Sequence, residues 1–250
     1  MLFTTVISAL VLAAGASARA VPNPVDLMKK SSHIVGKVIT TCSKPNVLAL
    51  AYDDGPYQYS SSLIDTLDAA GVKGTFFYTG TLYECIYNQS AAIKKAFEHG
   101  RMTHPHVGSL SAADLRTEME KVEQAMVNIF GRKPAYMRPP YLETGGSVLS
   151  VMKELGYTII TDDVDSMDWN GATPAQSEQT FQKLHGHGHG HGHIPLMHET
   201  YETTVTTLTS WLIDWAKSNK LKIVTVAECL GDADGMYKEG TFEGNGVNTC

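Results

Sequence analysis

Apolar runs of strand length alternate with longer amphipathic segments along most of the chain, and this alternation restricts the fold more than any other feature of the sequence. The longer segments carry apolar residues at helical spacing, and four of the five are followed within two residues by glycine. Strands and helices in alternation build a parallel sheet with helices outside, so the predicted class is α/β. The expected strands are Val47–Asp53, Gly74–Tyr78, Tyr136–Arg138, Tyr157–Asp162, Ile194–His198 and Lys222–Val226, and the expected helices are Ser61–Ala70, Ala91–Glu98, Ala112–Phe130, Ser147–Leu155 and Val205–Asn219.

The first expected strand ends in two adjacent carboxylates, Asp53 and Asp54, followed by a Gly-Pro turn. Successive side chains on a strand point to opposite sides, so the two aspartates can hold different tasks, one facing a metal and the other a substrate. Parallel sheets and barrels carry their chemistry at the carboxyl ends of strands. Other polar residues at or just after such ends are Arg138, Asp165 and His198. These side chains are the first candidates for an active site.

The N-terminal residues 1–20 have the pattern of a secretory signal peptide. An apolar run without acidic residues leads to Ala18-Arg19-Ala20, a small-residue cleavage pattern. The run is too short to span a bilayer. We therefore expect a signal peptide over residues 1–20, a leader over 21–40, one catalytic domain over 41–235 and a tail over 236–250, with the protein secreted to the extracellular space or cell wall.

Charge and composition limit the classes of partner. A net charge of -6 without a basic patch argues against nucleic acid and against anionic membranes. No segment beyond the signal is long and apolar enough to cross a bilayer, and we expect a monomer. Asn88-Gln89-Ser90 is an acceptor sequence for N-glycosylation, as in a secreted glycoprotein.

The four cysteines are an even number in a chain with a secretory signal, which predicts two disulfides. They are Cys42, Cys85, Cys229 and Cys250, and their spacing fits no zinc motif. Four cysteines allow three pairings, which the sequence leaves open. A bond between Cys42 and Cys229 would join the two ends of the domain, because these residues flank the expected strands.

Five short motifs occur in a fixed order: Tyr52-Asp53-Asp54-Gly55-Pro56, His104-Pro105, Arg138-Pro139-Pro140-Tyr141, Asp165-Ser166-Met167-Asp168-Trp169 and Leu196-Met197-His198. Together they resemble the polysaccharide deacetylase family of NodB-like carbohydrate esterases, and within it the fungal chitin deacetylases, over about residues 40–232. The resemblance implies a distorted (β/α) barrel of the NodB type. It also implies a metal-dependent hydrolase that removes acetyl groups from polymers of N-acetylglucosamine.

The resemblance assigns roles to the residues at the strand ends. Asp53 would be the general base and His198 the general acid. Arg138 would orient Asp53, and Asp165 would do the same for His198. A backbone N–H at Tyr141 would complete an oxyanion hole. Residues implied to contact the substrate are Pro140, Tyr141, Leu196, which would wall the acetyl methyl group, and Trp169, on which a sugar ring would stack.

The metal ligands are the point at which the chain departs from the family pattern. The family has two histidines spaced His-x-x-x-His, and the corresponding stretch is shorter here. His104 matches the second histidine. His106 projects to the same side as His104 in an extended chain, so we expect Asp54, His104 and His106 to bind one divalent metal, zinc first and cobalt second. The alternatives are Asp54 with His99 and His104, or a site with too few ligands.

A repeated His-Gly tract occupies residues 185–193. Such a sequence cannot build a packed core, so a flexible surface loop is expected. Its alternating imidazoles can capture nickel, copper or zinc. No acidic residue accompanies the tract in the sequence, and we therefore expect the catalytic metal elsewhere.

The leading functional hypothesis is a hydrolase of amide bonds that removes the N-acetyl groups of chitin or chitooligosaccharides and releases acetate. An O-acetyl xylan esterase and a peptidoglycan deacetylase are alternatives with the same machinery. A chitin-oligomer-binding protein with an impaired active site is the alternative of another class, and the shortened histidine segment favours it.

Overall fold

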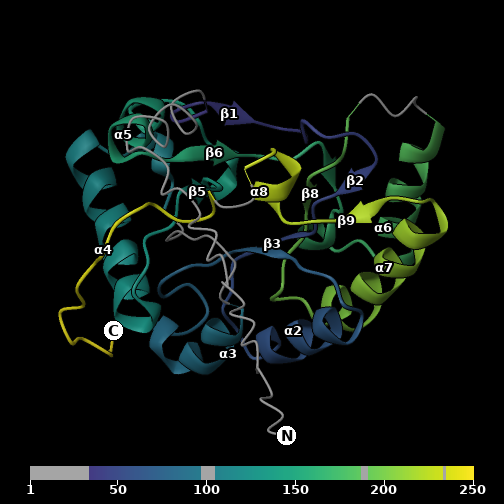
Figure 1. Cartoon of the computed structure of the whole chain (residues 1–250), viewed down its shortest axis with the longest axis horizontal. Coiled ribbons are helices and arrows are strands. Elements are labelled where there is room, and N and C mark those ends of the chain that lie inside the picture. Colours follow the sequence, from purple (N-terminus) through teal and green to yellow (C-terminus); the bar gives the residue numbers. More distant parts are fainter. Residues whose placement is uncertain (1–33, 97–104, 187–190, 233–234) are drawn as a thin grey trace, which may run out of the picture. The chain divides into compact units, whose positions relative to one another are not determined.

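The computed structural model describes residues 34–96, 105–186, 191–232 and 235–250, in which strands and helices alternate as the sequence predicts (Figure 1). The strands are β1 Val38–Ile39, β2 Val47–Leu48, β3 Ala51–Asp53, β4 Thr75–Phe77, β5 Tyr136–Met137, β6 Thr158–Ile160, β7 Val164–Asp165, β8 Pro195–Leu196 and β9 Lys222–Ile223. The α-helices are α2 Ser60–Ala69, α3 Ser90–Lys95, α4 Ala112–Phe130, α5 Val148–Leu155, α6 Pro174–Gln182, α7 Thr209–Ser218 and α8 Val226–Cys229. The expected α/β class is confirmed.

The named strand pairs of the described residues are all parallel. β1, β6 and β5 form one group in the order β1-β6-β5, and the remaining pairs are β2 with β9, β3 with β4 and β7 with β8. The segment that contains β8 also runs beside the segment that contains β2 and β3, where Ala49 N donates to His193 O at 2.9 Å and Asp53 N to Met197 O at 2.8 Å. Parallel strands bring their carboxyl ends to the same edge, which is where the candidate side chains lie.

The segment from Val47 to Asp53 lies at the centre of the structure, between two hydrophobic clusters. Its residues Leu48, Leu50 and Tyr52 pack in one cluster, while Val47, Ala49 and Ala51 pack in the other. A strand whose alternate residues are all buried has no face toward solvent. This position accounts for the nearly continuous apolar run that the sequence shows before Asp53.

Helix α4 has the bounds that its sequence predicts because its signals are local. Ser111 caps the first turn by accepting a hydrogen bond from Asp114 N at 3.1 Å. Gly131 ends the helix in a left-handed conformation with φ of 78°. The buried face carries Leu115, Met119, Val122, Met126 and Ile129, at helical spacing.

Of the strands and α-helices given above, four were not predicted: β1, β7, α6 and α8. Helix α6 buries only Ser177 and Phe181, so it has no apolar period, and it begins instead at a capping box made by Thr173 and Gln176. Strand β1 lies inside the expected leader, yet it pairs with β6. The leader expected over residues 21–40 therefore contributes a strand to the fold.

The described residues form two disulfides, Cys42–Cys229 and Cys85–Cys250. The first joins the two ends of the strand region. The second fastens the C-terminal tail, which also pairs with the chain where Lys238 N donates to Lys133 O at 2.8 Å. Within the described residues, no helix has the length and apolar character to cross a membrane.

Candidate active site

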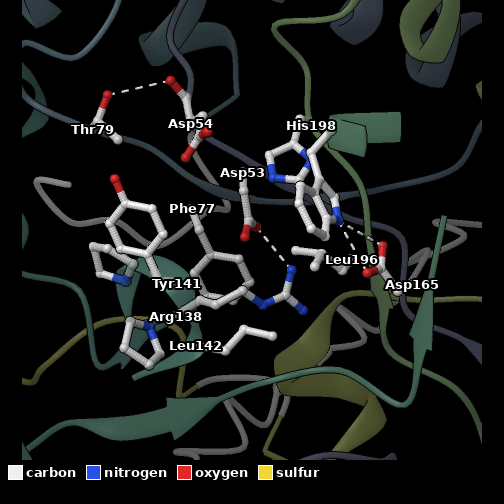
Figure 2. A pocket seen from close by; sticks show the side chains of 13 residues that line it. Asp53, Asp54, Phe77, Thr79, Arg138, Tyr141, Leu142, Asp165, Leu196 and His198 are labelled. Carbon is white, nitrogen blue, oxygen red and sulfur yellow. Dashed lines mark hydrogen bonds and ion pairs between the residues drawn. The ribbon is translucent and has the colours of Figure 1, made fainter. Parts of the chain in front are cut away.

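A cavity of about 320 Å³ opens at the carboxyl ends of the strands (Figure 2). Its lining includes nine of the residues singled out from the sequence: Asp53, Asp54, Arg138, Pro140, Tyr141, Asp165, Trp169, Leu196 and His198. Phe77, Thr79, Pro139 and Leu142 complete the wall. Two predicted metal ligands are not part of this lining. His104 lies outside the described residues, and His106 is absent from the lining but stacks on the ring of Tyr141, which belongs to it.

Asp53 ends β3 and is held by a buried guanidinium. Arg138 Nη1 donates to Asp53 Oδ1 at 2.8 Å (Figure 2). The same guanidinium donates from Nη2 to the carbonyls of Thr161 at 2.8 Å and Pro195 at 3.2 Å, and it stacks over the Phe77 ring at 4.7 Å. These contacts fix its orientation. Burial raises the pKa of Asp53 to about 6, although the charges of Arg138 and His198 oppose the rise.

His198 is paired with Asp168. His198 Nδ1 lies 2.7 Å from Asp168 Oδ1, and His198 N donates to Asp168 Oδ2 at 2.8 Å. Thr204 Oγ1 also donates to Asp168 Oδ2, at 2.8 Å. Burial alone would lower the pKa of His198, but the hydrogen bond and charge of Asp168 outweigh it and raise this pKa to about 9. The imidazole is therefore held as a charged proton donor near neutral pH.

The assignment of Asp165 as the partner of His198 is wrong, since Asp168 occupies that place. Asp165 instead accepts from Trp169 Nε1, at 3.0 and 3.2 Å, and from Met167 N at 2.7 Å. The left-handed Met167, with φ of 59°, reverses the chain between the two aspartates and sends them in different directions. Asp165 thereby holds the indole of Trp169, of which 50% is exposed at the cavity.

Asp54 departs from the alternation expected of a strand. Its φ of 68° is left-handed, and it lines the same cavity as Asp53. The next residue, Gly55, packs against the buried carboxylate of Glu199, which accepts a hydrogen bond from Ser60 Oγ. A Cβ at Gly55 would overlap Glu199 Oε1, so only glycine fits this turn. Glu199 was not foreseen, because nothing in the sequence links it to Gly55.

Tyr141 forms one wall of the cavity and is 58% exposed. It has a left-handed φ of 55°, and its ring stacks on His106 with centroids 4.0 Å apart and an angle of 6°. His106 Nδ1 lies 2.8 Å from Glu143 Oε1, and Glu143 Oε2 accepts from Gly108 N at 2.9 Å. Glu143 is a further residue that sequence reasoning missed.

Of the three predicted metal ligands, only Asp54 is among the described residues that line this cavity, and His106 lies outside the lining. Asp54 supplies a carboxylate, and the carboxylate of Glu143 at one ring nitrogen of His106 is the support that metal-binding histidines usually have. With Nδ1 as the donor in that contact, Nε2 of His106 keeps its lone pair. Among the described residues, a group of three metal-binding side chains with close ligand atoms occurs elsewhere, at Asp163, His191 and His193.

Comparison with known proteins defines the class. Residues 40–160 match the family model of the polysaccharide deacetylases. The chain is 36% identical over 219 residues to a chitin deacetylase of Pestalotiopsis sp, an alignment that covers 85% of this chain and 73% of the relative. It is also 36% identical to a chitin deacetylase of Colletotrichum lindemuthianum, covering 82% of this chain and 88% of the relative.

The solved structure of the chitin deacetylase from the fungal pathogen Colletotrichum lindemuthianum superimposes with a TM-score of 0.77 and 34% identity, over 83% of this chain and 98% of that one. The chain belongs to the polysaccharide deacetylase family. The family that the five motifs resemble is thereby confirmed, and with it the class of enzyme, a hydrolase that removes acetyl groups from polysaccharide.

Proposed function

We propose that this protein hydrolyses the N-acetyl groups of N-acetylglucosamine units in chitin or chitooligosaccharides and releases acetate. One observation carries the proposal: a carboxylate held by a buried arginine and an imidazole held by a buried aspartate line the same cavity. Two relatives that are 36% identical and cover 85% and 82% of the chain are named chitin deacetylase.

Amide hydrolysis needs a base and an acid, and the Asp53–Arg138 and His198–Asp168 pairs supply one each. Asp53 takes a proton from the attacking water, and its pKa of about 6 makes it a stronger base than an ordinary aspartate while it stays ionised at neutral pH. His198 gives a proton to the nitrogen that leaves as an amine, because Asp168 keeps the imidazole protonated. The backbone N–H of Tyr141 stabilises the oxyanion that forms between these steps.

Asp54, His104 and His106 are the proposed ligands of a divalent metal, with zinc first. When bound, such a metal polarises the acetyl carbonyl and lowers the pKa of the water. The ring of His106 stacks on that of Tyr141, and this contact would hold the proposed ligand next to the wall of the cavity. Chelation should remove activity, and added zinc should restore it.

The walls of the cavity suit an acetylated sugar. Leu196 presents an apolar side chain for the acetyl methyl, and Trp169 presents an indole that Asp165 holds at the rim. Pro140 and Tyr141 form the opposing wall. The strand pairs agree with the distorted barrel that we infer for this family. The two disulfides fit the oxidising route of a secreted protein.

Acetate release from defined chitin oligomers tests the function directly. The protein is stripped with a chelator, then assayed with and without added zinc on chitin oligomers, acetylated xylan and peptidoglycan. Metal-dependent release that is fastest on chitin oligomers supports the proposal. Faster release from xylan or peptidoglycan would reassign the substrate, and binding of chitin oligomers without release on any substrate would indicate the binding protein.

A further inference from the structure

A second group of metal-binding side chains lies away from the cavity, where the His-Gly tract joins the strand region. Asp163 precedes β7, while His191 and His193 precede β8. Their ligand atoms all lie within 4.8 Å of one another. Metal capture by the imidazoles of the tract is expected from the sequence, but the part of Asp163 is not, because this residue comes from a segment some thirty residues earlier.

The ligand atoms of the three side chains lie close to the distances that a tetrahedral zinc site requires, so only a small movement would be needed to bind the metal. His193 Nδ1 lies 2.6 Å from Asp163 Oδ2, and His191 Nε2 lies 4.0 Å from the same oxygen. The two rings are 5.6 Å apart at 62°. Tetrahedral zinc with ligand bonds of 2.0–2.2 Å keeps its ligand atoms about 3.4 Å apart, which lies between the two measured distances.

Asp163 is fixed by the backbone of the adjacent segment. Its Oδ1 accepts from Ile194 N at 2.7 Å, and its own N donates to Ile194 O at 3.1 Å. These bonds leave Oδ2 directed at the histidines. The side chains of Asp163 and His193 are only 13% and 14% exposed, whereas His191 is 53% exposed and has room to move. A partly enclosed carboxylate and imidazole with one adjustable imidazole suit the capture of a cation.

Gly192, between the two histidines, is required by its surroundings. A Cβ there would lie 2.6 Å from Val47 O and 2.8 Å from Lys44 O, both backbone atoms. Gly192 O accepts from Cys42 N at 3.1 Å. This close packing anchors the end of the His-Gly tract against the start of β2. The positions of His191 and His193 are therefore set by the fold and not by the tract alone.

The group is separate from the active-site cavity. His193 pairs with Leu48, and His198 pairs with Asp53, on the same two parallel segments. Five residues of strand at about 3.3 Å each put the two histidines roughly 17 Å apart. The two sites therefore lie at opposite ends of one strand pair.

We propose that Asp163, His191 and His193 form a second, structural site for a divalent transition metal of the zinc class. Two imidazoles and one carboxylate are ligands that zinc accepts, with water in the fourth position. When the metal binds at His193 Nδ1, the ring takes the tautomer with its proton on Nε2, and the hydrogen bond between Nδ1 and Asp163 Oδ2 is replaced by bonds from both atoms to the metal. When bound, it ties the end of the His-Gly tract to the segment that carries β7.

Zinc binding to the full chain tests this site. The Asp54→Asn variant serves as the parent, so that binding at the cavity is weakened, and zinc is titrated against a chromophoric chelator. Asp163→Asn on this parent keeps every imidazole of the tract and retains an acceptor for Ile194 N. Zinc affinity should fall ten- to hundredfold. His191→Ala, which changes an exposed side chain, should give a similar loss without affecting folding.

The matched control replaces His187 and His189 together by alanine, which changes the tract but not the proposed ligands. Its zinc affinity should stay within about threefold of the parent. Unchanged affinity in Asp163→Asn, with a loss in the control, would overturn the proposal and assign the metal to the tract alone. A second readout is the thermal midpoint, which zinc at a hundred times the parent's Kd should raise by roughly 5–10 °C in the parent and by about half as much or less in Asp163→Asn.

Discussion

Two histidines five residues apart, before and after β8, each contact an aspartate that lies thirty positions earlier in the chain. His193 Nδ1 is 2.6 Å from Asp163 Oδ2, and His198 Nδ1 is 2.7 Å from Asp168 Oδ1. Both histidines also pair with the central segment, His193 at Leu48 and His198 at Asp53. The two pairs are nearly identical in local geometry, so their chemistry must differ through their neighbours.

The neighbours differ in charge and in hydrogen bonding. His198 faces the carboxylate of Asp53 on the adjacent strand, whereas His193 lies beside the apolar Leu48. Asp168 accepts three further hydrogen bonds, from Trp169 N, His198 N and Thr204 Oγ1, so both of its oxygens are engaged and it cannot turn toward a cation. Asp163 Oδ2 has a second imidazole nearby instead. The same pair thus becomes a proton donor in one setting and a candidate metal site in the other.

The largest effect is expected at Asp53, the group that distinguishes the surroundings of His198. Asp53→Asn keeps the shape of the side chain and removes the base, so acetate release from chitin oligomers should fall by about 10³–10⁴-fold. Zinc binding by Asp54 should persist, measured by titration in protein that also carries Asp163→Asn so that the second group of ligands is weakened. Asp214→Asn, on the exposed face of α7, is the matched control and should keep full activity. Substantial turnover in Asp53→Asn would remove Asp53 from the role of base.

The next effect is expected at Asp168. Asp168→Asn should lower kcat by about 10²-fold, because the imidazole loses the carboxylate that keeps it protonated. The acid must carry its proton, so activity in the native protein should decline as pH rises through about 9. In the variant this decline should move to lower pH.

Asp165→Asn separates the two aspartates of this loop. Asp165 holds Trp169, so the variant should raise KM for chitin oligomers while the alkaline limb of the pH profile stays in place. If Asp165→Asn moved the alkaline limb and Asp168→Asn did not, the assignment of Asp168 to His198 would fail.

A further prediction concerns the pH dependence of stability. The His198–Asp168 pair should change the free energy of unfolding in a pH range in which Asp53 does not titrate. The pKa of His198 is raised to about 9 in the folded protein, against about 6.5 unfolded. Its contribution is fully present below pH 6.5 and is lost as pH rises through 9. A difference of this size corresponds to roughly 3 kcal/mol of unfolding free energy.

Asp53 acts in another pH window. Its pKa is raised to about 6 in the folded protein from 3.8, so its contribution to stability is present below about pH 4 and is lost as pH rises to about 6. Urea unfolding from pH 6.5 to 9.5 should therefore report on His198 and show stability falling with pH. Asp168→Asn should flatten that slope, and an unchanged slope would show that Asp168 does not control the imidazole.

Local signals account for what the sequence predicts of the fold. The bounds of α4 follow from a serine cap, an apolar period and a terminal glycine, all within one segment. Asp53, Arg138 and His198 were singled out because each lies at the end of an apolar run, and parallel pairing then brings such ends together. Helix α6 was missed because its capping box lies outside any apolar pattern.

Contacts between distant segments account for what the sequence does not predict. Asp165 and Asp168 are three residues apart, and the conformation of Met167 decides which of them reaches His198. Spacing alone contains no information about that turn. The approach of Asp163 to the end of the His-Gly tract depends on the pairing of β7 with β8, which was not foreseen because the segment of β7 has one apolar residue, Val164, among aspartates.

The smallest effect is expected for His193, in protein from which metal has been removed. His193→Ala removes one partly buried hydrogen bond to Asp163 and should lower the free energy of unfolding by about 1 kcal/mol. His198→Ala removes a charged, buried donor from Asp168 and Asp53 and should cost more at pH 6.5. The measurement is urea unfolding after chelation, repeated with zinc, which should stabilise the protein that retains His193 and leave His193→Ala unchanged. If His193→Ala and His198→Ala lowered the free energy of unfolding equally in metal-free protein, at pH 6.5 and at pH 9.5, the neighbouring groups would not be what makes the two histidine–aspartate pairs differ.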